Sequence, residues 1–222
     1  MGMILRIASS RIVGQGDIVG RSGYFSLNLS ANSVMRGRLD ARRTLKSLVA
    51  DLRLEKFYCN DTESVTGLFQ FLINEGDRVS YQIMLPHLLS ASNIHEFEEI
   101  IHKRFFGIER FIRQGKNLYN FVKYTEERRD PIIWINDLER GIVGWDMGLL
   151  VGLVRSALGS GYITKEEAWR YIEQANTLCT DILHTPEEID KSFLIGKAMK
   201  SEKIEDWDRF LSCYSRLDKY RK

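Results

Sequence analysis

Long apolar runs are missing from this 222-residue sequence, and no stretch comes near the roughly 18 consecutive apolar residues of a membrane-spanning helix. The first residues, Met1 to Arg6, meet a charge before the apolar core of a signal peptide could form. Both absences favour a cytoplasmic protein that does not span a membrane. With 44% hydrophobic and 28% charged residues, the composition is that of a globular chain rather than a disordered one.

Cysteine and histidine are scarce. The nearest two of the three cysteines, Cys179 and Cys213, are 34 positions apart, which argues against a disulfide framework and against a CxxC metal site. Two histidines, His95 and His102, lie seven positions apart, too far along a helix to bind one metal ion. A glycine-containing segment at 14–20 lacks the Lys-Ser/Thr ending of a phosphate loop. We therefore predict no metal site and no cofactor.

Neither sign of charge dominates the whole chain, because 32 Lys and Arg stand against 30 Asp and Glu. This balance is not typical of a dedicated nucleic-acid binder. The first 56 residues are locally basic, and one group of arginines there is either a phosphate-binding patch or the solvated face of a helix: Arg36, Arg38, Arg42 and Arg43. A second basic group consists of Lys103, Arg104, Arg110 and Arg113. The aromatic residues between them suit either stacking on nucleic-acid bases or packing in a hydrophobic core.

The periodicity predicts a mostly α fold. Residues 1–32 are rich in glycine and serine, which predicts a short extended or hairpin arm that offers a route to oligomers. Residues 33–222 form one predicted α-helical domain, a multi-helix bundle that opens with a helix over 33–58. Further helices are predicted to start at cap signals, namely Asn60, Asn93 (a helix running to Ile112), Asp146, Thr164 and Thr185. The run Ile132–Ile135 is either a short buried strand or a helix start.

Polar and aromatic residues near the predicted helix starts form a candidate site for a ligand or a partner. The group consists of Arg78, Trp145, Asp146, Glu166, Glu167 and Trp169. Each also has a structural explanation, because Asp146 suits a helix N-terminus and Glu167 completes a capping box with Thr164. The two tryptophans bring large apolar areas that suit helix packing. We predict no catalytic residues, since no Ser-His-Asp or Cys-His arrangement can be singled out.

Two segments resemble a known family. Gly144-Trp145-Asp146-Met147-Gly148 is similar to a WDxGR helix start, and the segment from Gly161 to Trp169 is similar to a GY-I-x-x-EEAW turn. Both motifs mark the uncharacterised bacterial YbeU/YbeR-like family, a domain of unknown function. A helix ending in Gly76-Asp77-Arg78 is similar to the family's Gly-His-Arg segment, so the resemblance covers residues 45–217.

The chain departs from that family at two positions. Leu149 stands where the family usually has arginine, and Asp77 stands where it often has histidine. The resemblance implies a helical, bacterial, intracellular protein without an established activity.

Three functions follow from these observations. We favour a non-catalytic helical interaction protein, immunity-like or regulatory, with a protein partner, because a complete helical framework lacks any catalytic motif. The first alternative is a nucleic-acid-associated protein that uses the N-terminal arginines. The second is a small-molecule-binding or hydrolytic protein that uses Asp146, Glu166 and Glu167, which would need one carboxyl kept neutral by burial.

Overall fold

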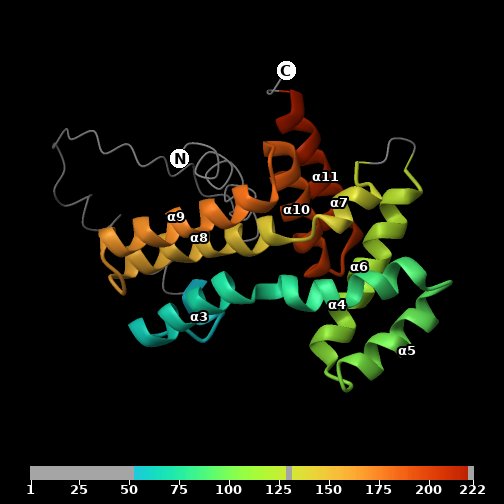
Figure 1. Ribbon diagram of the computed structural model, residues 1–222, viewed down its shortest axis with the longest axis horizontal. Coiled ribbons are helices and arrows are strands. Elements are labelled where there is room, and N and C mark those ends of the chain that lie inside the picture. Colours follow the sequence, from blue (N-terminus) through green and yellow to red (C-terminus); the bar gives the residue numbers. More distant parts are fainter. Residues whose placement is uncertain (1–52, 129–131, 220–222) are drawn as a thin grey trace. The chain divides into compact units, whose positions relative to one another are not determined.

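The computed structural model describes residues 53–128 and 132–219, which form helices and no strand (Figure 1). In chain order the helices are α3 (Thr62–Asn74), α4 (Gly76–Ser90), α5 (Ile94–Arg104), α6 (Glu109–Glu126), α7 (Ile135–Glu139), α8 (Val143–Ser160), α9 (Lys165–Ile182), α10 (Pro186–Met199) and α11 (Ile204–Lys219). The predicted mostly α, multi-helix fold is confirmed. The arm at 1–32, the four N-terminal arginines and most of the predicted helix at 33–58 lie outside the described residues.

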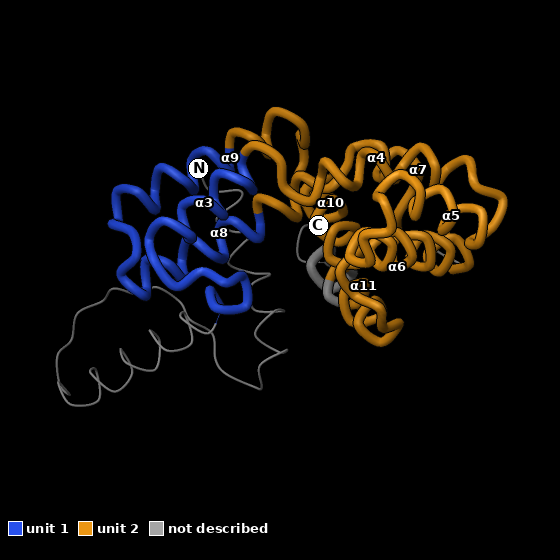
Figure 2. The backbone as a smooth tube through the Cα atoms, turned by 90° about the horizontal axis from the view of Figure 1, so that it is seen from below, with its two compact units in different colours: residues 1–73, 148–176 blue, residues 74–147, 177–222 orange. Residues whose placement is uncertain are grey.

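The chain divides into two compact units, drawn in different colours in Figure 2. Among the described residues, unit 1 comprises 53–73 and 148–176, and unit 2 comprises 74–128, 132–147 and 177–219. Helices α8 and α9 each contribute residues to both units. A single domain over residues 33–222 stays a prediction. Within residues 53–128 and 132–219, no helix combines the length and the apolar character that crossing a bilayer requires.

Unit 1 is built from α3 and from the parts of α8 and α9 that belong to it. The rings of Phe69 on α3 and Tyr171 on α9 meet edge to face, with centroids 4.9 Å apart. Helix α3 starts after Asp61, whose carboxylate accepts the N–H of Ser64 at 2.7 Å, so Asp61 rather than Asn60 is its cap. The predicted capping box at the start of α9 is present, because Thr164 and Glu167 exchange side-chain to backbone hydrogen bonds.

Unit 2 is organised around two helices, α6 and α10. Helix α6 packs against α4, α5 and α10, and α10 packs in addition against α7 and α11. The buried apolar side chains of these helices include Tyr81, Met84, Phe97, Ile101, Leu118, Phe121, Leu138, Ile195, Met199 and Trp207. This core holds together segments that are distant in the sequence.

Three sequence expectations change in unit 2. The helix predicted from Asn93 to Ile112 is two helices, because the backbone turns at Phe106 and Gly107, which both have positive φ. The run Ile132–Ile135 leads into α7 and is not a strand. Helix α4 has no counterpart among the predicted helices, and it begins at Gly76-Asp77-Arg78, where the family resemblance placed the end of a helix.

One close approach joins α8 to α10. A Cβ atom on Gly196 of α10 would lie 2.3 Å from Cβ and 2.5 Å from Cγ of Trp145. These atoms sit next to the main chain of Trp145 and cannot swing away like the end of a flexible side chain. The indole also lies beside Phe193 and Lys197. Glycine at 196 is therefore required by space, and it seats the indole of Trp145 on α10.

We expect Gly196→Ala to lower the free energy of unfolding by about 1–3 kcal/mol, the usual cost of forcing extra volume into a packed interior. Urea denaturation of the full chain measures this change. The matched control is Gly67→Ala on α3, where an added Cβ meets no atom within 4 Å. That variant should be stabilised by about 0.5–1 kcal/mol, because alanine is the better helix former. Similar effects at the two positions would contradict the packing argument.

Candidate functional site

Asp146 binds the start of another helix rather than the start of its own. Helix α8 begins at Val143, so the predicted role of Asp146 as the cap of this helix is wrong. Its carboxylate accepts the backbone N–H of Asp77 at 3.0 Å and that of Arg78 at 3.1 Å, both in the first turn of α4. The Arg78 guanidinium also donates to it at 3.1 Å. Because Asp146 is fully buried, these three donors replace water around its charge.

The backbone conformation at Gly76 allows the Asp146 carboxylate to reach the first N–H groups of α4. The residue before it, Glu75, forms no side-chain cap hydrogen bond, so the first N–H groups of α4 need another acceptor. Gly76 has φ of +65°, a conformation that favours glycine, and a Cβ there would lie 2.1 Å from Oδ2 of Asp146. Glycine is therefore required both by the backbone conformation and by the space that the carboxylate fills.

A second buried carboxylate, Asp77, lies beside the first. Its Oδ2 accepts the indole N–H of Trp145 at 3.1 Å. Its Oδ1 accepts a hydrogen bond from Arg110 of α6 at 3.0 Å and one from Lys200, at the end of α10, at 2.7 Å. Asp77 is only 5% exposed. This carboxylate therefore ties α4 to α6, α8 and α10 through three donors.

We call these six residues the Asp77–Asp146 cluster: Asp77, Arg78, Arg110, Trp145, Asp146 and Lys200. Burial raises the pKa of Asp146 to about 6; the N–H groups of Arg78 and Asp77 oppose this rise, and the charge of Asp77 adds to it. Burial also acts to raise the pKa of Asp77, but Lys200, Trp145 and Arg110 together hold it below its ordinary value. The two carboxylates thus titrate in separate pH ranges.

The cluster is suited to neutralising buried charge and holding helices together. Its two carboxylates face three cations, and each carboxylate receives three hydrogen bonds. Burial raises the pKa of the nearby Cys179 thiol to about 12, and the charge of Asp146 acts in the same direction, so the thiolate form is disfavoured. In the part of the chain that the structure describes, no three His, Cys, Asp or Glu side chains lie close enough to hold a metal ion.

The structure brings together three of the six candidate residues. Arg78, Trp145 and Asp146 meet in unit 2, whereas Glu166, Glu167 and Trp169 lie on α9 within unit 1. Neither unit by itself contains Asp146 together with the two glutamates. The Glu166 side chain is exposed, Glu167 caps α9, and Trp169 is 38% exposed.

Sequence reasoning did not identify Asp77 and Lys200 as members of this site, and it placed Arg110 in the second basic group instead. The available signal was the pair of motifs around Trp145-Asp146 and Gly76-Asp77-Arg78. These segments, 69 positions apart, contact each other directly. Asp77 lies at the centre of the contact.

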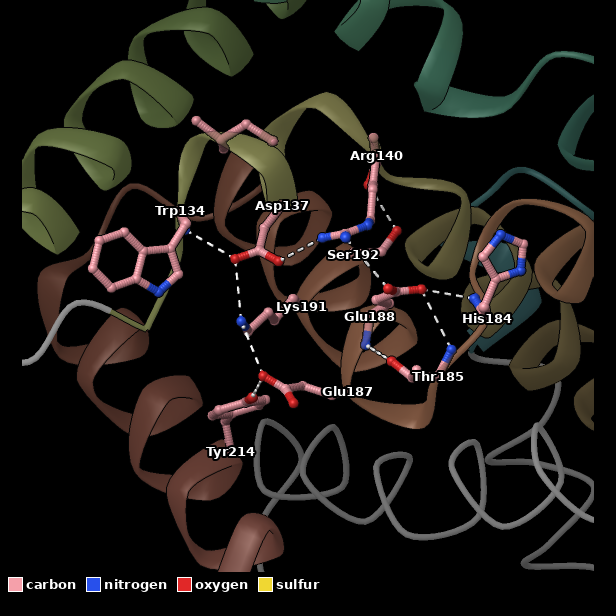
Figure 3. Close-up of polar contacts among 12 residues, drawn as sticks. Trp134, Asp137, Arg140, His184, Thr185, Glu187, Glu188, Lys191, Ser192 and Tyr214 are labelled. Atoms are coloured by element: carbon pink, nitrogen blue, oxygen red, sulfur yellow. Dashed lines mark hydrogen bonds and ion pairs between the residues drawn. The ribbon is translucent and has the colours of Figure 1, made fainter.

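A second charged network in unit 2 was also missed (Figure 3). Buried Asp137 of α7 accepts from Lys191 of α10 at 3.2 Å and from Arg140 at 3.3 Å, and it caps its own helix at the Trp134 N–H. Lys191 pairs with Glu187 as well, at 3.0 Å. These contacts join α7 to α10 and, like the first cluster, hold helices in place.

We expect the pH dependence of stability to reveal the buried state of Asp146. Its pKa is raised on folding, from an ordinary 3.8 to about 6, so the folded chain holds the proton more tightly than the unfolded chain. The resulting stabilisation is complete below about pH 4 and is lost as the pH rises through 6. Its size is on the order of 3 kcal/mol, because one pKa unit corresponds to about 1.4 kcal/mol.

Urea denaturation of wild type and Asp146→Asn between pH 4 and pH 8 measures this effect, because other titrating groups largely cancel in the difference. The wild type should lose stability relative to the variant as the pH rises from 4 to 6 and then show a constant difference. A difference that does not change with pH would show that Asp146 titrates normally.

Comparison with known proteins gives one family. The family model described as "Protein of unknown function (DUF1266)" matches residues 54–222, a range that contains the whole Asp77–Asp146 cluster. Neither the curated proteins nor the solved structures contain a match to the chain.

Proposed function

From the premise that the chain belongs to the DUF1266 family, whose function is unknown, we propose that it is a non-catalytic helical protein-binding module, immunity-like or regulatory in kind. The observation that carries the proposal is that both carboxylates of the Asp77–Asp146 cluster are buried and hydrogen-bonded within the protein. Each carboxylate accepts three hydrogen bonds. A carboxylate that acts as a general acid or base must instead reach a substrate.

The exposed apolar side chains of unit 2 support a role in protein binding rather than in catalysis. Several large apolar side chains there are at least half exposed: Phe106, Ile108, Trp134, Ile135 and Ile204. Aromatic anchors of this kind dominate the energetics of protein–protein interfaces. Single exposed apolar residues are ordinary on soluble proteins, so this support rests on their size and number.

The nucleic-acid alternative has less support among the described residues. Two of the four cations in the second basic group are engaged in ion pairs, Arg110 with Asp77 at 3.0 Å and Arg113 with Glu202 at 3.4 Å. This pairing reduces the positive charge available for phosphate contacts.

Within the family, we place the chain with the YbeU/YbeR-like proteins and take it as bacterial and cytoplasmic. The support is the pair of motifs that meet at the Asp77–Asp146 cluster. We also propose that residues 33–222 act as one helical domain.

Affinity purification of the tagged full chain from its host, with and without nuclease and with the tag alone as control, tests the proposed function. We expect stoichiometric recovery of one protein, insensitive to nuclease, that binds the purified chain saturably in calorimetry. Recovery that disappears with nuclease would favour the nucleic-acid alternative. Recovery of no specific protein would contradict the proposal and return attention to a small ligand.

A further inference from the structure

The turn between α5 and α6 (Figure 1) ends α5 with the hydrogen bonds of a Schellman motif. Gly107 N–H donates to the His102 carbonyl at 2.9 Å, and Phe106 N–H donates to the Lys103 carbonyl at 3.4 Å. The motif requires a left-handed residue at the position that Phe106 occupies, and its φ is +54°. The side chain of this phenylalanine is 90% exposed.

Helix α8 ends with the same motif and uses glycine there. Gly161, with φ of +80°, donates to the Leu158 carbonyl at 3.3 Å, and Tyr162 N–H donates to the Ala157 carbonyl at 2.9 Å. Glycine adopts this conformation without steric cost, whereas a bulky side chain is strained in it. An exposed phenylalanine gains little packing in return. Phe106 therefore opposes stability at a position where glycine would favour it. Tyr58 in unit 1 shares this strain, so it is the strain together with the charge next to Phe106 that points to a use outside the fold.

The tip of the turn is held rigidly. Phe105 is buried and stacks on Phe111 of α6, with ring centroids 4.6 Å apart. The Phe105 carbonyl also accepts the N–H of Ile108 at 3.0 Å. An aromatic side chain on a fixed backbone loses little conformational entropy when it binds, so Phe106 is preorganised as an anchor.

Two positively charged residues lie close to this anchor in the chain. Lys103 and Arg104 are exposed and form no ion pair with another described residue, whereas Arg110, whose side chain is 55% exposed, already pairs with Asp77. Glu109 is the one acid between residues 102 and 113. An apolar tip framed by cations complements an apolar pocket with an acidic rim.

We propose that Phe106 is the anchor with which this chain binds its protein partner, inserting into an apolar pocket rimmed by Asp or Glu that pair with Lys103 and Arg104. The inference rests on the proposed function and names the surface that would perform it. A lipid surface is the weaker match, because membrane binding scales with buried apolar area and the tip offers only Phe106 and Ile108.

Tyr58 in unit 1 provides a matched control. Its φ is +58°, its side chain is 92% exposed, and its turn has the same two hydrogen bonds, from Tyr58 to Glu55 and from Cys59 to Leu54. Its neighbours Glu55, Lys56 and Asp61 are of mixed charge. The same substitution there removes an exposed aromatic residue from the same motif without touching the charged frame of Phe106.

The test uses the full chain with a photo-crosslinking residue, Phe106→p-benzoylphenylalanine, and Tyr58→p-benzoylphenylalanine as control. We expect the first to cross-link one protein, next to Asp or Glu residues of that protein. The affinity of the purified partner is then measured. Phe106→Gly should weaken it at least tenfold, as should Lys103→Glu combined with Arg104→Glu, whereas Tyr58→Gly should leave it unchanged.

Stability separates loss of binding from loss of folding. The urea midpoint of Phe106→Gly should be equal to or higher than that of the wild type, because glycine relieves the strained φ. Phe106→Asn is a second variant that lacks the aromatic anchor, because asparagine also tolerates a positive φ.

Three outcomes would overturn the inference: unchanged affinity in Phe106→Gly, an equal loss in Tyr58→Gly, or binding of the turn to phosphatidylglycerol vesicles with no cross-linked protein. If a partner is captured by the tagged chain yet Phe106→Gly binds it normally, the inference fails and the proposed function stands. If no partner is captured, the proposed function fails.

Discussion

A buried carboxylate that caps a helix distant in sequence is the interaction on which unit 2 depends. Asp146 closes the start of α4 with two backbone hydrogen bonds and pairs with Arg78. Removing one partner from a buried, hydrogen-bonded ion pair leaves an uncompensated charge, which costs far more than the pair contributes. The glycine at 76 and the indole of Trp145 both occupy positions that this carboxylate and its neighbour Asp77 require. The start of α4, the charge balance of the two carboxylates and the packing of Trp145 therefore depend on one another.

The same arrangement separates the interior of unit 2 from its surface. Asp77 and Asp146 each accept three hydrogen bonds, from donors that hold α4, α6, α8 and α10. The surface has a different character, with a strained and exposed phenylalanine between two helices. Within unit 2, stability is thus concentrated in the interior and reduced at the turn between α5 and α6.

Sequence predicted the helical fold and the local caps because their signals lie within one turn of helix. The capping boxes at Thr164 and Thr185 need only a residue three positions away, and both are present. The partners of Asp146 are 69 and 68 positions away, so no local pattern could assign them. The break at Phe106 was hidden because apolar residues keep helical spacing through it; Gly107 was the one local sign of a helix end.

The ion pair between Asp77 and Lys200 joins two residues that are synthesised at different times. Its members are 123 positions apart, so a ribosome adding about 5–20 residues per second exposes the carboxylate roughly 6–25 s before its ammonium partner. Until then, burying Asp77 would leave its charge without one of its two cations. The charge balance around Asp77 is therefore complete only once the end of α10 is present.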